Sequence, residues 1–165
     1  MSELTRREYD KLYENYVGID EAGRGCVGGS LFFVGAKLKD GVTTDQISFV
    51  NDSKKTIHTQ RILWAKRLRD LIDVKIVQST AQDIDTKGLS KCISDSLESI
   101  KEHFKSYKFI YDGNTSYKVS DIETIVKGDS KVSLIAAASV IAKLKKDIES
   151  EEIHKLFPEY GFNGH

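Results

Sequence analysis

The sequence is poor in the residues that stabilise small secreted folds and structural metal sites. Its 165 residues include two cysteines, Cys26 and Cys92, and a single proline. The cysteines form no Cys-x-x-Cys pair and no cluster with histidine, which excludes a disulfide framework and argues against a structural zinc site. Unpaired cysteines fit a reducing compartment. One proline argues against long proline-rich linkers.

An excess of charge of one sign is also missing, and so are long apolar runs. Lys and Arg number 25, against 25 Asp and Glu. This balance excludes a strongly basic protein held on its partner by bulk charge, but local patches can still bind nucleic acid. The longest apolar stretch, residues 134–141, is too short for a bilayer. The charged start has no apolar signal core, so we expect a cytoplasmic protein.

The length and the hydrophobic pattern predict one α/β domain over residues 1–165, with residues 1–15 as a solvated helical extension. We expect strands over 16–19, 30–38, 74–78, 108–111 and 122–126. We expect helices over 4–15, after a cap at 51–53, over 86–105 and over 132–156, the last burying Ala137, Ile141, Leu144 and Ile148. The short connection between the first two strands predicts an antiparallel hairpin. The element order therefore favours a mixed β-sheet flanked by helices.

Carboxylates follow three of the predicted strands. Asp20 and Glu21 end the first strand, Asp112 ends the fourth, and Asp129 follows the fifth, each beside a glycine-bearing turn. Strands of one sheet can bring these ends together, where the four carboxylates would repel one another unless cations lay between them. Mg²⁺ prefers such oxygen ligands, and two ions about 3.5–4 Å apart can promote in-line displacement at phosphorus. The pattern offers a route to phosphodiester hydrolysis.

Each acid also has a simpler interpretation. Asp112 before Gly113 is common turn chemistry, and Asp129 can favour the dipole of the helix that follows it. Asp20 and Glu21 are neighbours in a strand, so their side chains point to opposite faces unless the backbone bends. Spacing alone leaves a metal-dependent nuclease as one hypothesis among these.

Six sequence blocks resemble the ribonuclease HII family, the type 2 ribonucleases H, and they occur in that family's order. They are GIDEAGRG at 18–25, DSKK at 52–55, YDGN at 111–114, KGD at 127–129, AAASVIAK at 136–143 and FPEYGF at 157–162. The resemblance spans about residues 16–165. It implies an RNase H-like fold and cleavage on the 5′ side of a ribonucleotide within a duplex, which leaves a 3′-hydroxyl and a 5′-phosphate.

The resemblance also implies roles for particular residues. The catalytic and metal-binding residues would be the four carboxylates Asp20, Glu21, Asp112 and Asp129, with Mg²⁺ or Mn²⁺ as cofactor. The ribose would be read by the turn Gly23, Arg24 and Gly25, since a 2′-hydroxyl is both donor and acceptor and glycines let the main chain approach it. The substrate backbone would be held by Lys54, Ser139 and Lys143. We expect a monomer acting on an RNA–DNA hybrid or a ribonucleotide-containing DNA duplex.

Some features keep other interpretations open. Lys54 and Lys143 could be solvated helix charges, and Asp147 could simply pair with Lys143 one turn earlier. Cys26 stands where the family usually has proline. The family has a C-terminal tail that carries a tyrosine, which would stack on the sugar at the RNA–DNA junction. We expect no counterpart of this tail in the sequence, which ends at residue 165. Alternatives are therefore an RNase H-like nuclease for another nucleic-acid structure and a catalytically weak duplex-binding fragment.

Overall fold

The fold is built on a mixed five-stranded sheet. The computed structural model describes residues 3–24, 29–50 and 56–156. The strands, in the spatial order β3-β2-β1-β4-β5, are β3 (Ile72–Ser79), β2 (Leu31–Leu38), β1 (Tyr16–Ala22), β4 (Lys108–Asp112) and β5 (Ile122–Ile125). The pairs β1–β2 and β2–β3 are antiparallel, whereas β1–β4 and β4–β5 are parallel. The predicted mixed sheet and the predicted hairpin are confirmed.

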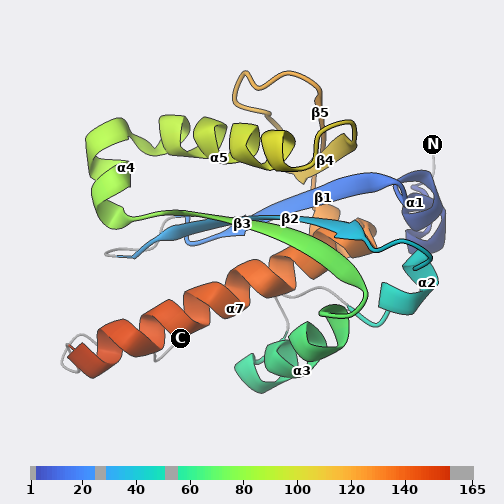
Figure 1. Cartoon of the computed structure of the whole chain (residues 1–165), viewed down its shortest axis with the longest axis horizontal. Helices are drawn as coiled ribbons and strands as arrows, with labels where there is room; N and C mark the ends of the chain where they lie inside the picture. The colour runs from blue at the N-terminus through green and yellow to red at the C-terminus, as the bar shows by residue number, and fades with distance from the viewer. Residues whose placement is uncertain (1–2, 25–28, 51–55, 157–165) are drawn as a thin grey trace.

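Helices cover both faces of this sheet (Figure 1). On one face lie α4 (Ala81–Lys87) and α5 (Leu89–His103), and on the other lie α3 (His58–Leu68) and the long α7 (Ser133–Leu156). The shorter helices are α1 (Arg6–Leu12), α2 (Thr44–Ile47) and α6 (Gly128–Lys131). Each layer of helices buries its own apolar core against the sheet. In the part of the chain described here, no helix is both long and apolar enough to cross a bilayer.

The helices differ from the prediction at several points. The helix expected over 86–105 is divided by Gly88, whose φ of +86° ends α4 and precedes α5. The short helices α2 and α6 have too few residues to give a periodic signal. The cap expected at 51–53 lies outside the described residues, and α3 follows Ile57 instead. Ile148 was expected to be buried but is 43% exposed, because the second half of α7 extends beyond the sheet (Figure 1).

The first half of α7 lies unusually close to β1. Its residues from Leu134 to Ala138 are buried, and three of them are alanines. At Gly18 of β1, a Cβ atom would come within 2.7 Å of the Leu134 carbonyl carbon and 2.8 Å of the Ile135 nitrogen. Helix backbone cannot move aside as a flexible side chain can, so Gly18 has to lack a side chain for this packing.

The beginning of α7 is fixed by α1. Asp10 of α1 is buried, and its carboxylate accepts hydrogen bonds from the Ser133 backbone N–H at 2.6 Å and from the Ser133 hydroxyl at 2.5 Å. Arg6 also reaches this point, donating to the Ser133 hydroxyl and to the Val50 carbonyl. The expectation of a merely solvated helix at the N-terminus is therefore wrong for this face of α1. Periodicity gave no sign of it, because the buried residue is itself charged.

We predict that Asp10→Ala lowers the free energy of unfolding by about 1–3 kcal/mol, since it leaves a buried helix-terminal N–H without its acceptor. Asp10→Asn, which keeps one acceptor oxygen, should cost less. Urea denaturation followed by circular dichroism measures both. Asp40→Ala, at an exposed acid in a turn, is the control and should change the value by no more than about 0.5 kcal/mol. Equal losses for Asp10→Ala and Asp40→Ala would contradict this role.

Candidate active site

Three aspartates from three different elements meet at one end of the sheet. Asp20 lies in β1, Asp112 is the last residue of the neighbouring parallel strand β4, and Asp129 lies in α6. The register that pairs Ile19 with Tyr111 places Asp20 beside Asp112. One carboxylate oxygen from each of the three residues lies within 4.8 Å of the others. The structure thus brings together three of the four predicted carboxylates.

Asp129 reaches this cluster through a tight connection after β5. Lys127 has a left-handed backbone with φ of +57°, and Gly128 follows it at the start of α6. The Gly128 N–H donates to Asp112 Oδ1 at 3.0 Å, and the Asp129 N–H donates to Asp112 Oδ2 at 3.4 Å. A Cβ on Gly128 would come within 2.9 Å of Ile125 and 2.7 Å of Ile135. Gly128 therefore allows the approach that joins Asp129 to Asp112.

The cluster is electrostatically unfavourable by itself. Asp20 is 7% exposed and Asp129 is 2% exposed. Burial, and then the neighbouring carboxylates of Asp112 and Glu21, raise the pKa of Asp20 well above its usual range. Buried like charges this close need a compensating cation or a proton. Three hard carboxylate donors fit a divalent cation such as Mg²⁺ or Mn²⁺, so this donor set suits the metal that the sequence predicted.

Glu21 lies beside the three aspartates and not among them. It follows Asp20 in β1, and its Oε1 lies 3.6 Å from the Arg24 guanidinium. Burial raises the pKa of Glu21, while a hydrogen bond with the Asp20 carboxyl, the charge of Arg24 and a hydrogen bond from Tyr111 lower it. Its other oxygen, Oε2, is buried and has no hydrogen-bond partner among the described residues. That oxygen remains available to a ligand next to the cluster.

The structure describes only some of the predicted substrate-binding residues. Gly23 has a φ of +106° and precedes Arg24, whose side chain is exposed, whereas Gly25 and Lys54 lie outside the described residues. Ser139 is 1% exposed on α7, and Lys143 follows it by one turn and is half-buried. Ser139 therefore offers at most a small edge of its hydroxyl to a ligand.

Two tyrosines and one ion-pair cluster were not predicted. The Tyr117 ring lies 5.6 Å from the Arg24 guanidinium, and Tyr111 hydrogen bonds to Glu21. Strand alternation around Asp112 could have placed Tyr111 on the Glu21 face, but no local pattern marks Tyr117. Asp147 accepts from Arg61 at 2.9 Å and lies 2.9 Å from His58 Nδ1, which joins α7 to α3. The sequence interpretation paired Asp147 with Lys143 of its own helix, whereas these contacts tie it to α3.

The sequence as a whole matches the model of one protein family, described as Ribonuclease HII, over residues 17–165. The chain belongs to the ribonuclease HII family. Ribonuclease HII of Sulfurovum sp. (strain NBC37-1) is 36% identical over 148 residues, which cover 90% of this chain and 76% of that protein. Ribonuclease HII of Campylobacter concisus (strain 13826) is 39% identical over 148 residues, covering 90% and 77%.

Solved structures agree with this membership. The ribonuclease HII of Archaeoglobus fulgidus, solved in complex with PCNA, is 25% identical with a TM-score of 0.72, covering 88% of this chain and 77% of that one. The ribonuclease H2 of Pyrococcus horikoshii OT3, at 23% identity, shares the fold with a TM-score of 0.72, covering 85% and 75%. The RNase H-like fold is thereby confirmed. As a type 2 ribonuclease H, the chain is a metal-dependent endonuclease, and its aspartate cluster can hold the metal.

We predict that the metal-free protein loses stability as the pH rises. Below the ordinary aspartate pKa of 3.8, Asp20 is protonated in both the folded and the unfolded chain. Above it, the unfolded chain releases this proton while the folded chain keeps it, until the pH passes the raised pKa of Asp20. Asp20→Asn removes this penalty and still accepts the Glu21 N–H. The Tm of Asp20→Asn minus that of the wild type, measured in EDTA, should therefore grow from pH 4 to pH 8.

The same melting curves with Mn²⁺ complete this test. Binding to the folded state raises Tm, and it needs ionised carboxylates, so the increase should be larger at pH 8 than at pH 5 in the wild type and small in Asp20→Asn. A Tm difference that does not change with pH, together with equal Mn²⁺ effects in both proteins, would contradict the role of Asp20.

Proposed function

We propose that the chain hydrolyses the phosphodiester on the 5′ side of a ribonucleotide, in an RNA–DNA hybrid or in a DNA duplex with embedded ribonucleotides. The products are a 3′-hydroxyl and a 5′-phosphate. The observation that carries the proposal is the group of three aspartates, with oxygens within 4.8 Å of one another, beside the Arg24 turn. A cation site for phosphate and a turn for the ribose then lie next to each other.

The carboxylates divide the work of holding the metal. Asp20, Asp112 and Asp129 would bind it, and the buried Oε2 of Glu21 would supply a fourth ligand position. When bound, Mg²⁺ or Mn²⁺ lowers the pKa of water and stabilises charge on the leaving oxygen. The backbone N–H groups of Gly128 and Asp129 hold the Asp112 carboxylate in position. Fixed ligands of this kind reduce the reorganisation needed during the reaction.

We propose that Gly23, Arg24 and Gly25 read the ribose. The positive φ of Gly23 gives the main chain a conformation that a residue with a side chain rarely adopts. Arg24 is held between the Glu21 carboxylate and the Tyr117 ring. Main-chain N–H and C=O groups at such a turn can pair with a 2′-hydroxyl, which DNA lacks. We propose that this pairing selects the ribonucleotide.

Phosphate contacts would position the duplex without reading its sequence. Lys143 on α7 is half-buried and follows Ser139 by one turn, and we propose both, with Lys54, for the substrate backbone. We also propose that the protein acts as a monomer.

The experiment uses three end-labelled duplexes: one with a single ribonucleotide in DNA, one RNA–DNA hybrid and one all-DNA duplex, each with Mg²⁺ and with Mn²⁺. We expect cleavage on the 5′ side of the ribonucleotide, cleavage of the hybrid and no cleavage of DNA. Asp112→Asn keeps one oxygen to accept the Gly128 N–H but loses a charge, so cleavage should fall at least about 100-fold while duplex binding in Ca²⁺ persists.

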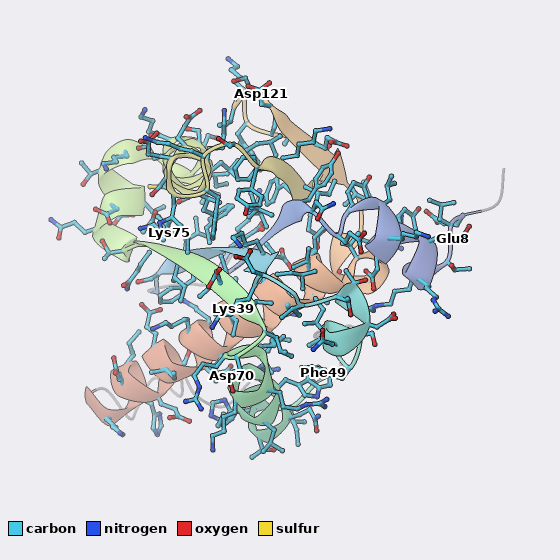
Figure 2. All side chains as sticks on the ribbon, turned by 45° about the vertical axis from the view of Figure 1, so that its right-hand side comes forward. Glu8, Lys39, Phe49, Asp70, Lys75 and Asp121 are labelled. Atoms are coloured by element: carbon cyan, nitrogen blue, oxygen red, sulfur yellow. The ribbon has the colours of Figure 1, made fainter. Side chains whose placement is uncertain are left out.

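Asp70→Asn is the matched control, because Asp70 is an exposed acid near the end of α3. Figure 2 shows Asp70 on the α3 side of the sheet. It should cleave like the wild type. Folded wild-type protein that binds Mn²⁺ but cuts none of the three duplexes would overturn the proposed function. Cleavage of the hybrid alone would retain the metal site and overturn recognition of a single ribonucleotide.

A further inference from the structure

A recess of about 520 Å³ lies between α5 and the segment that joins β4 to β5. From α5 it is lined by Ser90, Lys91 and Ser94, and from the β4–β5 segment by Thr115, Tyr117 and Lys118. Figure 1 shows this segment arching beside α5, on the side of the sheet opposite to α7. The recess is therefore formed by two elements that are far apart in the sequence.

The lining of the recess has the chemistry of an anion site. It offers two ammonium groups and four hydroxyl groups, and no carboxylate is among the lining residues. Asp95 forms an ion pair with Lys91 at 3.0 Å, but both side chains are well exposed. Such a pair contributes little, so an incoming anion can compete for the ammonium group. Lysines together with serine and threonine hydroxyls are typical contacts of nucleic-acid phosphates.

The recess lies next to the candidate active site. Tyr117, on its wall, contacts Arg24, which in turn pairs with Glu21. Thr115, on the same wall, follows Asp112 by three residues, a length of chain that spans at most about 11 Å. Since a duplex rises about 3.4 Å per base pair, the recess lies within about three base pairs of the aspartates. A duplex bound at the aspartates is therefore long enough to reach the recess.

The wall of the recess is held in a defined conformation. Tyr117 and Lys118 have left-handed backbones, with φ of +52° and +66°, which residues other than glycine rarely adopt. The Tyr117 N–H donates to the Thr115 hydroxyl at 3.1 Å. The next residue, Val119, is buried in the core beneath α5. These constraints keep the Tyr117 ring at Arg24 and leave Lys118 exposed beside it.

We propose that this recess binds a backbone phosphate of the duplex substrate, at a position separate from the cleaved bond. The proposal rests on the proposed function and extends its substrate contacts to the α5 side of the sheet. Lys91 and Lys118 supply the charge, and the hydroxyls of the recess supply further hydrogen bonds. Binding there strengthens the hold on the duplex without contributing to the chemical step.

The test compares the double variant Lys91→Gln/Lys118→Gln with the control Lys11→Gln/Lys105→Gln. The control removes the same charge from two exposed lysines outside the recess, Lys11 on α1 and Lys105 in the turn after α5. Affinity for a fluorescent ribonucleotide-containing duplex is measured in Ca²⁺ over a range of NaCl concentrations. We expect the recess variant to bind about tenfold more weakly, with a slope of log K against log salt that is smaller by about 1. Its kcat at saturating substrate should equal that of the wild type.

Varying the length of the duplex distinguishes binding of a substrate phosphate from binding of a free anion. Two sets of duplexes are shortened, each on one side of the ribonucleotide. Shortening on the side that reaches the recess should remove the difference in affinity between the recess variant and the wild type. Shortening on the other side should leave that difference unchanged. Equal affinity and slope for the recess variant and the control would overturn the proposal. So would a loss of affinity that is the same for all duplex lengths, which is the result expected of a nonspecific charge effect. If the wild type cleaves no substrate, the proposed function fails, but the salt slope still tests the recess.

Discussion

The mutual repulsion of buried carboxylates is the constraint on which this structure depends. Asp20, Asp112 and Asp129 offer oxygens within 4.8 Å of one another, and two of the three are at least nine-tenths buried. In water these groups would separate, so the fold has to hold them together and a cation has to compensate their charge. The raised pKa of Asp20 expresses this unfavourable arrangement in the metal-free protein. A donor set made only of carboxylate oxygens suits hard divalent cations.

The fold holds the acids together by packing backbone against backbone. Two adjacent parallel strands place Asp20 beside Asp112, and the left-handed turn at Lys127 with Gly128 brings Asp129 to the Asp112 carboxylate. Gly18 allows the first half of α7 to lie against β1, and Asp10 fixes the beginning of that helix. These contacts lie around the cluster and not within it. Substitutions at them should therefore alter the geometry of the acids without removing a ligand.

The sequence predicted the parts that have a local signal. Alternating and apolar runs located all five strands, and acids at three strand ends suggested a carboxylate cluster as one hypothesis among simpler ones. The family resemblance added the roles of the Arg24 turn and of the lysines. The contact of Tyr117 with Arg24 and the cap from Asp10 to Ser133 could not be predicted, because each joins residues more than 90 positions apart through side chains with no periodic pattern.

We propose that the three aspartates form the metal centre of this type 2 ribonuclease H. The most direct measurement is the anomalous scattering of Mn²⁺ in a crystal grown with that ion. We expect an anomalous peak bounded by the carboxylates of Asp20, Asp112 and Asp129, and its loss in Asp112→Asn. A crystal of protein that is active with Mn²⁺ but shows no peak among these three residues would contradict this assignment.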